Sequence, residues 1–128
     1  SAWATSQGIP LDKQARRPHV TIAYSKADVD WDIMMPRLNQ LKIVVSPRKI
    51  MKLGDMGAVV LGFDSDILQD RHKELRRLGC SWDYPSYMPH VTFCWELPES
   101  VKYYNIEPFY GELTFGEESF EDISETFE

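Results

Sequence analysis

The fold is decided by a tetrapeptide that occurs twice, as Pro18-His19-Val20-Thr21 and as Pro89-His90-Val91-Thr92. Both copies continue with an apolar, a small and an aromatic residue, as Ile22-Ala23-Tyr24 and as Phe93-Cys94-Trp95. The 128 residues include only three histidines, and two of them lie in these repeats. Core packing has no need for the same polar pair twice, so the repeat indicates a functional site.

The alternation of residue types predicts a β-strand over each repeat, at 18–25 and at 89–95. Residues two apart on a strand share a face, so the histidine and threonine of each repeat point the same way. Their side chains would then lie about 7 Å apart along the surface, at a rise of ~3.3 Å per residue. If the two halves are related by pseudo-symmetry, all four polar groups face one groove.

These four residues suit the chemistry of a phosphodiester. Histidine titrates near neutral pH, so one imidazole can accept a proton while the other donates one. Threonine hydroxyls can hydrogen-bond the non-bridging oxygens and hold developing charge. We therefore expect a catalytic site, without metal or cofactor, made of His19, Thr21, His90 and Thr92.

Two alternatives weigh against this interpretation. A lone histidine on a strand is usually a structural residue, although the duplication makes that explanation weaker here. A zinc site is the other use of paired histidines, but zinc normally takes three or four protein ligands. The third histidine, His72, lies four residues after Leu68 on a predicted helix, where we expect it to pack beside the apolar stripe.

The amino-acid composition indicates a globular domain and argues against a protein that binds duplex DNA. Hydrophobic residues make up 43% and aromatic residues 12% of a chain of single-domain length, which is typical of a globular core. A net charge of −6 argues against duplex DNA as a partner, because that affinity comes from cations facing phosphates. A local anion site is still compatible with three basic clusters, namely Lys13, Arg16 and Arg17, then Arg48, Lys49 and Lys52, and then Arg71, Lys73, Arg76 and Arg77.

The expected location is the cytoplasm. Cys80 and Cys94 lack the spacing of a zinc site and the density of a disulfide scaffold, so both are expected to be reduced. No apolar run reaches the ~18 residues that span a bilayer, and no membrane partner is expected. The chain begins with Ser1, not methionine, which is typical of a segment of a longer protein. The oligomeric state is left open.

The remaining pattern predicts an α+β fold, because strands alternate with one or two helices. Asp64-Ser65-Asp66 supplies helix N-cap candidates, and that helix should end before Gly79. Residues 26–40 are ambiguous, because a helical stripe is formed there by Trp31, Met34, Met35 and Leu38. Pro36 limits any helix in this segment to a turn or two around it. The other expected strands lie at 2–7, 41–45, 49–53, 58–63 and 109–115, an aromatic loop lies at 81–88, and the acidic C-terminal segment is expected to fray.

The paired His-Val-Thr motifs resemble those of the two-histidine (2H) phosphoesterase superfamily, in particular its compact phage and bacterial members. Weaker similarity extends to 4–7, 71–75 and 111–116. The resemblance implies a bilobal duplicated fold in which two small antiparallel sheets flank a cleft with outer helices. It also implies a single domain over 1–128, with a pseudo-repeat of about 1–64 and 65–128.

The same resemblance implies a metal-independent phosphodiesterase with two-histidine acid–base catalysis. Its substrate would be a nucleotide or RNA end, such as a 2′,3′-cyclic phosphate, a 2′-5′ oligonucleotide or a cyclic oligonucleotide. The phage-like character favours a phage nuclease that acts on cyclic oligonucleotides in the host cytoplasm. The residues do not decide which histidine is the acid.

Substrate-binding candidates lie close to the repeats. Trp82, Tyr84 and Tyr87 belong to the loop that leads into His90, and aromatic faces stack on unpaired bases. Arg17 precedes the first motif and is a candidate phosphate contact. The competing interpretations are a non-catalytic nucleotide-binding module and a virion-associated structural module of the same fold.

Overall fold

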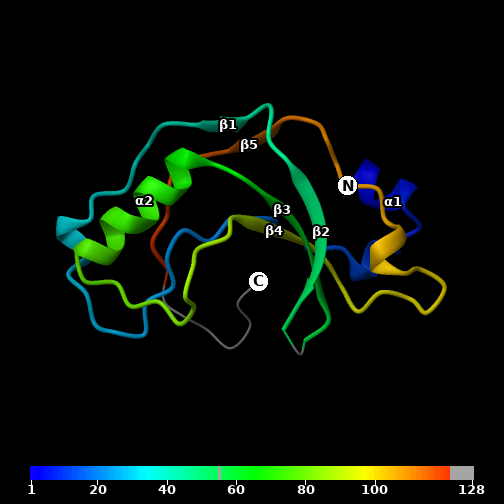
Figure 1. The fold of residues 1–128 in the computed structure, drawn as a ribbon, viewed down its shortest axis with the longest axis horizontal. Coiled ribbons are helices and arrows are strands. Elements are labelled where there is room, and N and C mark those ends of the chain that lie inside the picture. The colour runs from blue at the N-terminus through cyan, green and yellow to red at the C-terminus, as the bar shows by residue number, and fades with distance from the viewer. Residues whose placement is uncertain (55, 122–128) are drawn as a thin grey trace.

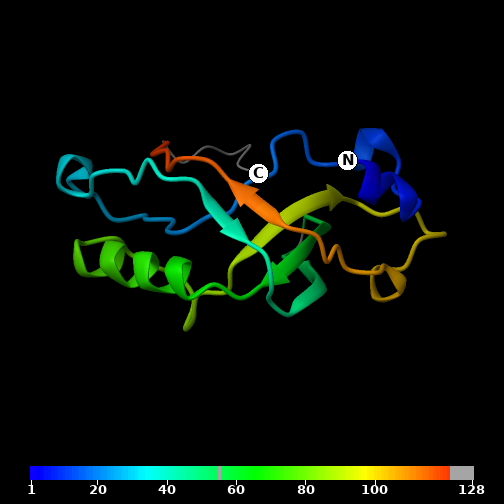
Figure 2. The ribbon, with the colours of Figure 1, turned by 90° about the horizontal axis from the view of Figure 1, so that it is seen from above.

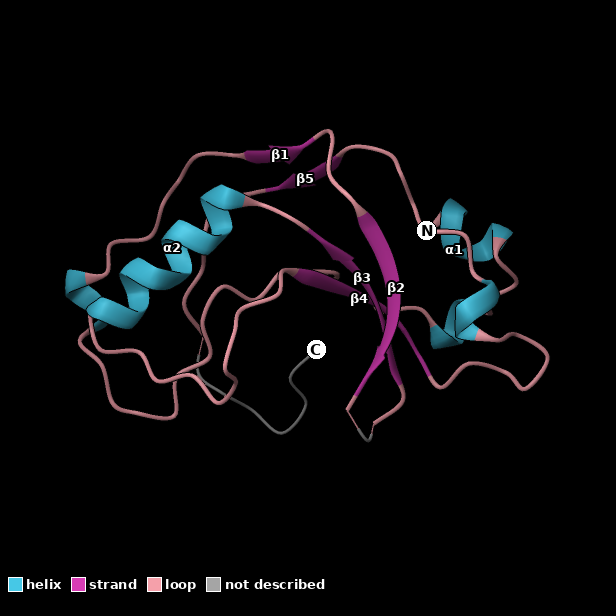
Figure 3. Cartoon of the chain, in the orientation of Figure 1, coloured by secondary structure: helices cyan, strands magenta, loops and turns pink. Residues whose placement is uncertain are grey.

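The centre of the fold is β3 (Ala58–Phe63), whose six residues are all buried. In the computed structural model, which describes residues 1–54 and 56–121, β3 lies between β2 (Arg48–Leu53) and β4 (His90–Trp95), and both pairings are antiparallel (Figure 1). A compact apolar run of this length predicts a strand covered on both faces, and the structure confirms it. Figure 3 shows that long strands are concentrated in this sheet, while much of the chain around α2 is loop.

A second, smaller sheet pairs β1 (Leu41–Ile43) with β5 (Leu113–Phe115). The pairing is antiparallel, with Leu41 opposite Phe115. In Figure 1 this pair runs above the three-stranded sheet. The predicted α+β class with two small antiparallel sheets is therefore confirmed.

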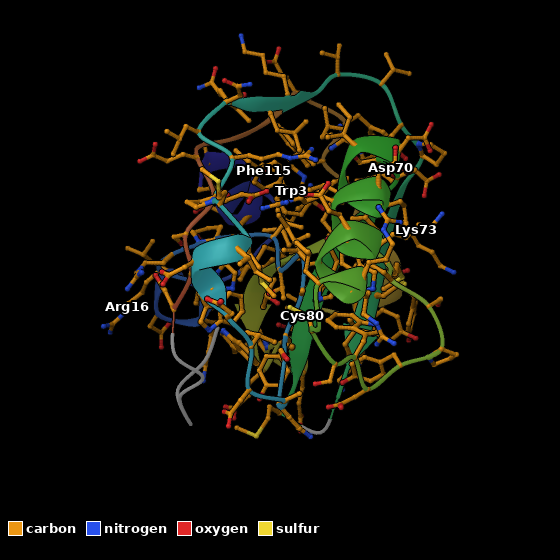
Figure 4. All side chains as sticks on the ribbon, turned by 90° about the vertical axis from the view of Figure 1, so that its left-hand side faces the viewer. Trp3, Arg16, Asp70, Lys73, Cys80 and Phe115 are labelled. Carbon is orange, nitrogen blue, oxygen red and sulfur yellow. The ribbon has the colours of Figure 1, made fainter. Side chains whose placement is uncertain are left out.

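The long helix α2 (Asp66–Arg77) begins where the sequence predicts. The side chain of Ser65 accepts a hydrogen bond from the Leu68 amide at 3.2 Å, which caps the first turn. Its buried face consists of Leu68, Arg71, His72 and Leu75, so the predicted stripe also contains two charged or polar residues. Asp70 and Lys73 lie on the outer side of the helix (Figure 4).

The N-terminal segment is helical, so the prediction of a strand at 2–7 is wrong. α1 (Ala2–Ser6) is capped by Ser1, whose side chain accepts from the Ala4 amide. The helix buries Ala4 and sets Trp3 edge-on against Phe93, with ring centroids 4.9 Å apart. Figures 1 and 2 show α1 and α2 at opposite ends of the molecule.

Short 3-10 helices complete the described elements: η1 (Leu11–Lys13), η2 (Trp31–Ile33) and η3 (Tyr103–Asn105). In the ambiguous segment 26–40, only Met34 of the expected stripe is buried, with 1% of its surface exposed. None of the helices within 1–54 and 56–121 has the length and apolar character needed to cross a membrane.

Three hydrophobic clusters hold these elements together. The first joins α1 to the three-stranded sheet, the second joins α2 and the small sheet to β3 and β4, and the third lies under the other end of α2. Cys94 lies in the first cluster and Cys80 in the third, just beyond the C-terminal end of α2 (Figure 4). Both cysteines are buried free thiols.

One residue of the third basic cluster, Arg71, is used for folding. Arg71 is only 2% exposed, and its guanidinium pairs with Glu118 at 2.8 Å and with Glu74. It also donates to the Met34 carbonyl at 2.8 Å. This charge is therefore compensated, and Arg71 contributes nothing to an anion site. Glu118 also docks the acidic segment, whose last residues, 122–128, lie outside the described part of the chain.

Candidate functional site

The two identical repeats lie side by side, because Val20 and Val91 form an antiparallel bridge. Antiparallel pairing around such a bridge sets His19 opposite Thr92, and Thr21 opposite His90. Both valines belong to the second core cluster, so their neighbours in the chain point to the opposite face. Both histidines and both threonines are half-buried on that face.

The sheet register extends this arrangement across three strands. A middle row, Ile50, Leu61 and Val91, faces the core. On the opposite face lie two flanking rows, one with Lys49, Gly62 and His90 and the other with Met51, Val60 and Thr92. The bridge adds Thr21 to the first of these rows and His19 to the second. We call this surface the histidine face.

Both histidines are oriented in the same way. The Nδ1 atom of His19 lies 2.9 Å from the Arg17 carbonyl oxygen, and that of His90 lies 2.9 Å from the Met88 carbonyl oxygen. A carbonyl oxygen only accepts, so Nδ1 carries the proton and donates in each case. This hydrogen bond fixes the orientation of each ring. The repeat is thus preserved in hydrogen bonding as well as in sequence.

Two aromatic side chains hold the first repeat in place, and we call them the aromatic clasp. The Tyr87 hydroxyl donates to the Thr21 carbonyl at 2.6 Å, and His72 Nδ1 donates to the Ile22 carbonyl at 2.6 Å. Their rings stack on each other, with centroids 4.4 Å apart and an interplanar angle of 7°. Burial raises the pKa of Tyr87 above its usual range, so its hydroxyl stays a donor.

The clasp explains why the prediction of a strand at 18–25 is wrong. Apart from the bridge at Val20, this segment has no regular strand structure. The Thr21 and Ile22 carbonyls, which a neighbouring strand would otherwise engage, accept from the clasp side chains. The predicted strand at 89–95 is confirmed as β4.

The four predicted substrate-binding residues differ in how exposed they are and in which groups they contact. Tyr87 is 7% exposed and stacked on His72, so its ring positions the first repeat and is not open to a base. Trp82 is half-buried, with its indole donating to the Ser86 carbonyl, while Tyr84 is 68% exposed. Arg17 is exposed and pairs with Glu121 at 3.6 Å.

The prediction that His72 packs beside the apolar stripe is confirmed, because His72 is 7% exposed, but the clasp was not predicted. His72 and Tyr87 are 50 and 66 residues from the carbonyls they bind, and no local pattern links them. Among the described residues, no three or more His, Cys, Asp or Glu side chains are grouped to hold a metal ion.

A hollow of about 450 Å³ lies along the outer edge of β2, and we call it the β2-edge hollow. Neither histidine of the repeats lines it, so it is distinct from the site that they form. Lys49 belongs both to its wall and to the histidine face. Its lining consists of Arg48, Lys49, Ile50 and residues 103–108.

The family model described as "Anti-CBASS protein Acb1" matches residues 1–128, the whole of the chain. The chain belongs to the anti-CBASS protein Acb1 family. It is 43% identical over 128 residues to the Acb1 of Caulobacter sp. (strain RHG1), and 40% identical over 131 residues to that of Sphingomonas paeninsulae. It is 29% identical over 90 residues to the Acb1 of Enterobacteria phage T4.

The Acb1 relatives are longer than this chain. The Caulobacter and Sphingomonas matches cover 96% and 97% of this chain but only 20% and 21% of those proteins. The phage T4 match covers 70% of this chain and 57% of the phage protein. The chain therefore spans about a fifth of the length of the first two relatives.

Membership of the Acb1 family corrects two expectations. The resemblance to the 2H phosphoesterase superfamily is overturned, because the family matched over the full length is Acb1. The assignment as a two-histidine phosphodiesterase of nucleotides or RNA is overturned with it, since the matches name an anti-CBASS protein. Both rested mainly on the eight residues of the repeat, because the similarity elsewhere was weaker, and a motif that short does not define a family.

Proposed function

We propose that this chain degrades cyclic oligonucleotides, and that the histidine face is where the phosphodiester is cut. The chain belongs to a family named as anti-CBASS proteins, and degradation of cyclic oligonucleotides is the activity that we infer from this membership. The observation that carries the proposal is the Val20–Val91 bridge, which sets two identical His-Val-Thr motifs against each other.

The proposed catalytic residues are His19, Thr21, His90 and Thr92. A phosphodiester is anionic and presents oxygens alone, so it is recognised by hydrogen-bond donors. The two hydroxyls supply donors toward non-bridging oxygens, and each imidazole can present Nε2, because Nδ1 is engaged by a backbone carbonyl. The scissile phosphate would lie over the bridge, within reach of all four side chains.

The proposal also includes the domain organisation and the residues that would bind the rest of the substrate. We infer a single domain over 1–128 with a pseudo-repeat of about 1–64 and 65–128, because each half contributes one motif in one orientation. Two lobes would then flank the bridge. Trp82 and Tyr84 remain candidates for stacking on a base, and Arg17 for a phosphate contact, because all three retain exposed surface.

The proposed setting is the cytoplasm of an infected bacterium. Relatives named Acb1 in several phages support this, among them those of Enterobacteria phage T4 and Acinetobacter phage Ac42. The substrate there would be a second messenger made by the host. This setting requires neither duplex DNA nor a membrane as a partner.

The test is a cleavage assay with a panel of cyclic di- and trinucleotides, resolved by chromatography. The wild type should cut at least one ring, and His19→Ala and His90→Ala should each lose at least about 100-fold in rate, as expected for groups that act in the transition state. Thr92→Ala should lose activity as well, whereas Thr114→Ala, an exposed threonine on β5, should not.

Two results would contradict the proposal. If no ring is cut by the wild type, the activity is wrong. If rings are cut equally well by both histidine variants, whose folding circular dichroism should confirm, the site is wrong. Linear 2′-5′ oligoadenylate and 2′,3′-cyclic mononucleotides in the same panel measure how far the activity is restricted to rings.

A further inference from the structure

Lys49 connects the histidine face to the β2-edge hollow. In the sheet register it lies opposite Gly62, which in turn lies opposite His90, so the three residues share one face. Two strand spacings of about 4.8 Å put the Lys49 backbone roughly 10 Å from that of His90. Lys49 is exposed, and among the described residues no hydrogen bond or ion pair engages its ammonium group.

The residue between Lys49 and His90 in the sheet register is Gly62, which is buried. A Cβ at this position would lie 2.6 Å from the Met51 Cε atom, so the flexible end of Met51 occupies the space above the glycine. Backbone and a thioether methyl therefore separate the cation from the imidazole. Such a floor offers van der Waals contact to a sugar without competing for its phosphates.

The hollow beyond Lys49 has the side chains of a nucleotide subsite. Tyr104 is 69% exposed, and Tyr103 stands edge-on to it with ring centroids 5.4 Å apart. Proteins bind unpaired nucleotides by combining a cation for the phosphate with an aromatic ring for the base. Asn105 and Glu107 line the same hollow and supply an amide and a carboxylate that can pair with the edge of a base.

Arg48 gives the hollow a second positive charge. Its guanidinium donates to the backbone carbonyls of Phe109, Ile43 and Gly111 at 3.0–3.3 Å, and none of these partners is a carboxylate. Its Nε atom is buried and has no hydrogen-bond partner among the described residues. The two cations outnumber the single carboxylate of Glu107, so the lining favours an anion.

We propose that the β2-edge hollow binds a second nucleotide of the cyclic oligonucleotide, with Lys49 on its phosphate and Tyr104 on its base. This rests on the proposed function, because a ring that presents one phosphodiester to the histidines carries another beside it. The row from His90 through Gly62 to Lys49 leads the ring from the cut bond to the hollow. Lys49 and Tyr104 are thus binding residues for the part of the ring that is not cut.

Steady-state kinetics on a cyclic dinucleotide test the role of Lys49. Lys49→Ala should raise KM by about tenfold, the effect of losing one charge-assisted hydrogen bond, with the loss falling mainly in KM and not in kcat. The matched control is Lys52→Ala, which removes another exposed lysine from the same strand but on the opposite face. The control should keep the wild-type KM.

A binding measurement tests the hollow without relying on cleavage. Adenosine 5′-monophosphate, which carries one phosphate and one base, is titrated into ¹⁵N-labelled chain. The amide signals of Lys49, Tyr103 and Tyr104 should shift, and Lys49→Ala should remove the shifts, whereas Lys52→Ala should retain them. Tyr104→Ala should weaken binding by about tenfold, as for the loss of one base stack.

The outcomes separate this proposal from the proposed function. Cleavage of rings with equal KM for Lys49→Ala and Lys52→Ala overturns the subsite and leaves the activity in place. Shifts at the hollow without cleavage of any ring support a nucleotide site there and overturn the activity. Shifts confined to other residues overturn the subsite in either case.

Discussion

The two copies of Pro-His-Val-Thr have the same sequence but different support. The copy at 89–92 enters β4, whose backbone pairs with β3 from His90 to Trp95. The copy at 18–21 has one bridge, and the carbonyls of Thr21 and Ile22 accept from Tyr87 and His72. Identical residues thus reach the same face by two routes, one through a backbone ladder and one through side chains.

The first copy is more vulnerable to single substitutions than the second. A ladder distributes the support of β4 over many backbone hydrogen bonds, which single substitutions barely affect. The first copy relies on one hydroxyl donor, from Tyr87, and one imidazole donor, from His72. A single substitution removes either of them. We therefore expect mutations of the clasp to affect the first repeat far more than the second.

The largest effect on stability should come from His72→Ala. It removes the donor to the Ile22 carbonyl and the ring that stacks on Tyr87, and it leaves a cavity under α2. A loss of about 3 kcal/mol in the free energy of unfolding is expected, measured by urea denaturation. His72→Ala should also slow ring cleavage, because the first repeat loses a donor that positions it. His72→Asn keeps a side-chain N–H near the position of Nδ1 and should restore part of that cleavage rate. Equal activity of the Ala and Asn variants would show that the clasp does not position the site.

Truncation of the two bridging valines, Val20 and Val91, should lower the free energy of unfolding by different amounts. Val91 is 9% exposed within the second core cluster, whereas Val20 is half-buried at its margin. Val91→Ala should cost roughly 2 kcal/mol of unfolding free energy and Val20→Ala roughly half as much, because the less buried side chain loses less contact. Equal losses in parallel denaturation curves would mean that both repeats are equally embedded.

Tyr87→Phe isolates the hydroxyl of the clasp. It leaves the ring stack intact and deprives the Thr21 carbonyl of its 2.6 Å partner. The expected loss of stability is about 1–2 kcal/mol, the usual effect of leaving a largely buried acceptor without a donor. Tyr110→Phe, at an exposed tyrosine, is the matched control and should have no effect. A rate of ring cleavage that falls in the first variant alone would tie the clasp to the site.

The smallest difference is expected between the two buried cysteines, in the rate at which their thiols are alkylated in the folded protein. Burial raises the pKa of the Cys80 thiol and raises that of Cys94 to about 11, so both are protonated near pH 8 and react only after local opening. Cys80 packs beside Ile22 and Ala23, whereas Cys94 is fully buried in β4. Alkylation followed by mass spectrometry should modify Cys80 first. Faster modification of Cys94 would contradict this prediction, because it would mean that β4 opens more readily than the segment around Cys80.

The same contrast explains what the sequence could predict. β3, α2 and β4 were predictable because apolar periodicity and the Ser65 cap act within the element itself. The segment at 18–25 was not, because its partners are 50 and 66 residues away. α1 was missed because five residues are too few to show a helical period, and its capping and burial decide its form.

The candidate site was predictable only in part. Duplication singled out both histidines and both threonines, yet it did not reveal the clasp or the row that leads to Lys49. Tyr87 was expected to stack on a base because it is aromatic and close to His90 in the chain. Its burial beside His72 depends on how α2 packs, which no local pattern contains. The short motif also misdirected the family assignment, which the full-length match corrected.

The central claim is that the two repeats form one site that cuts a cyclic oligonucleotide. A crystal structure of the chain with a phosphorothioate cyclic dinucleotide, which resists cleavage, tests it most directly. We predict one phosphorothioate group over the Val20–Val91 bridge, within hydrogen-bonding distance of His19 and His90. A ring bound elsewhere, with both histidines out of reach of its phosphates, would contradict the account.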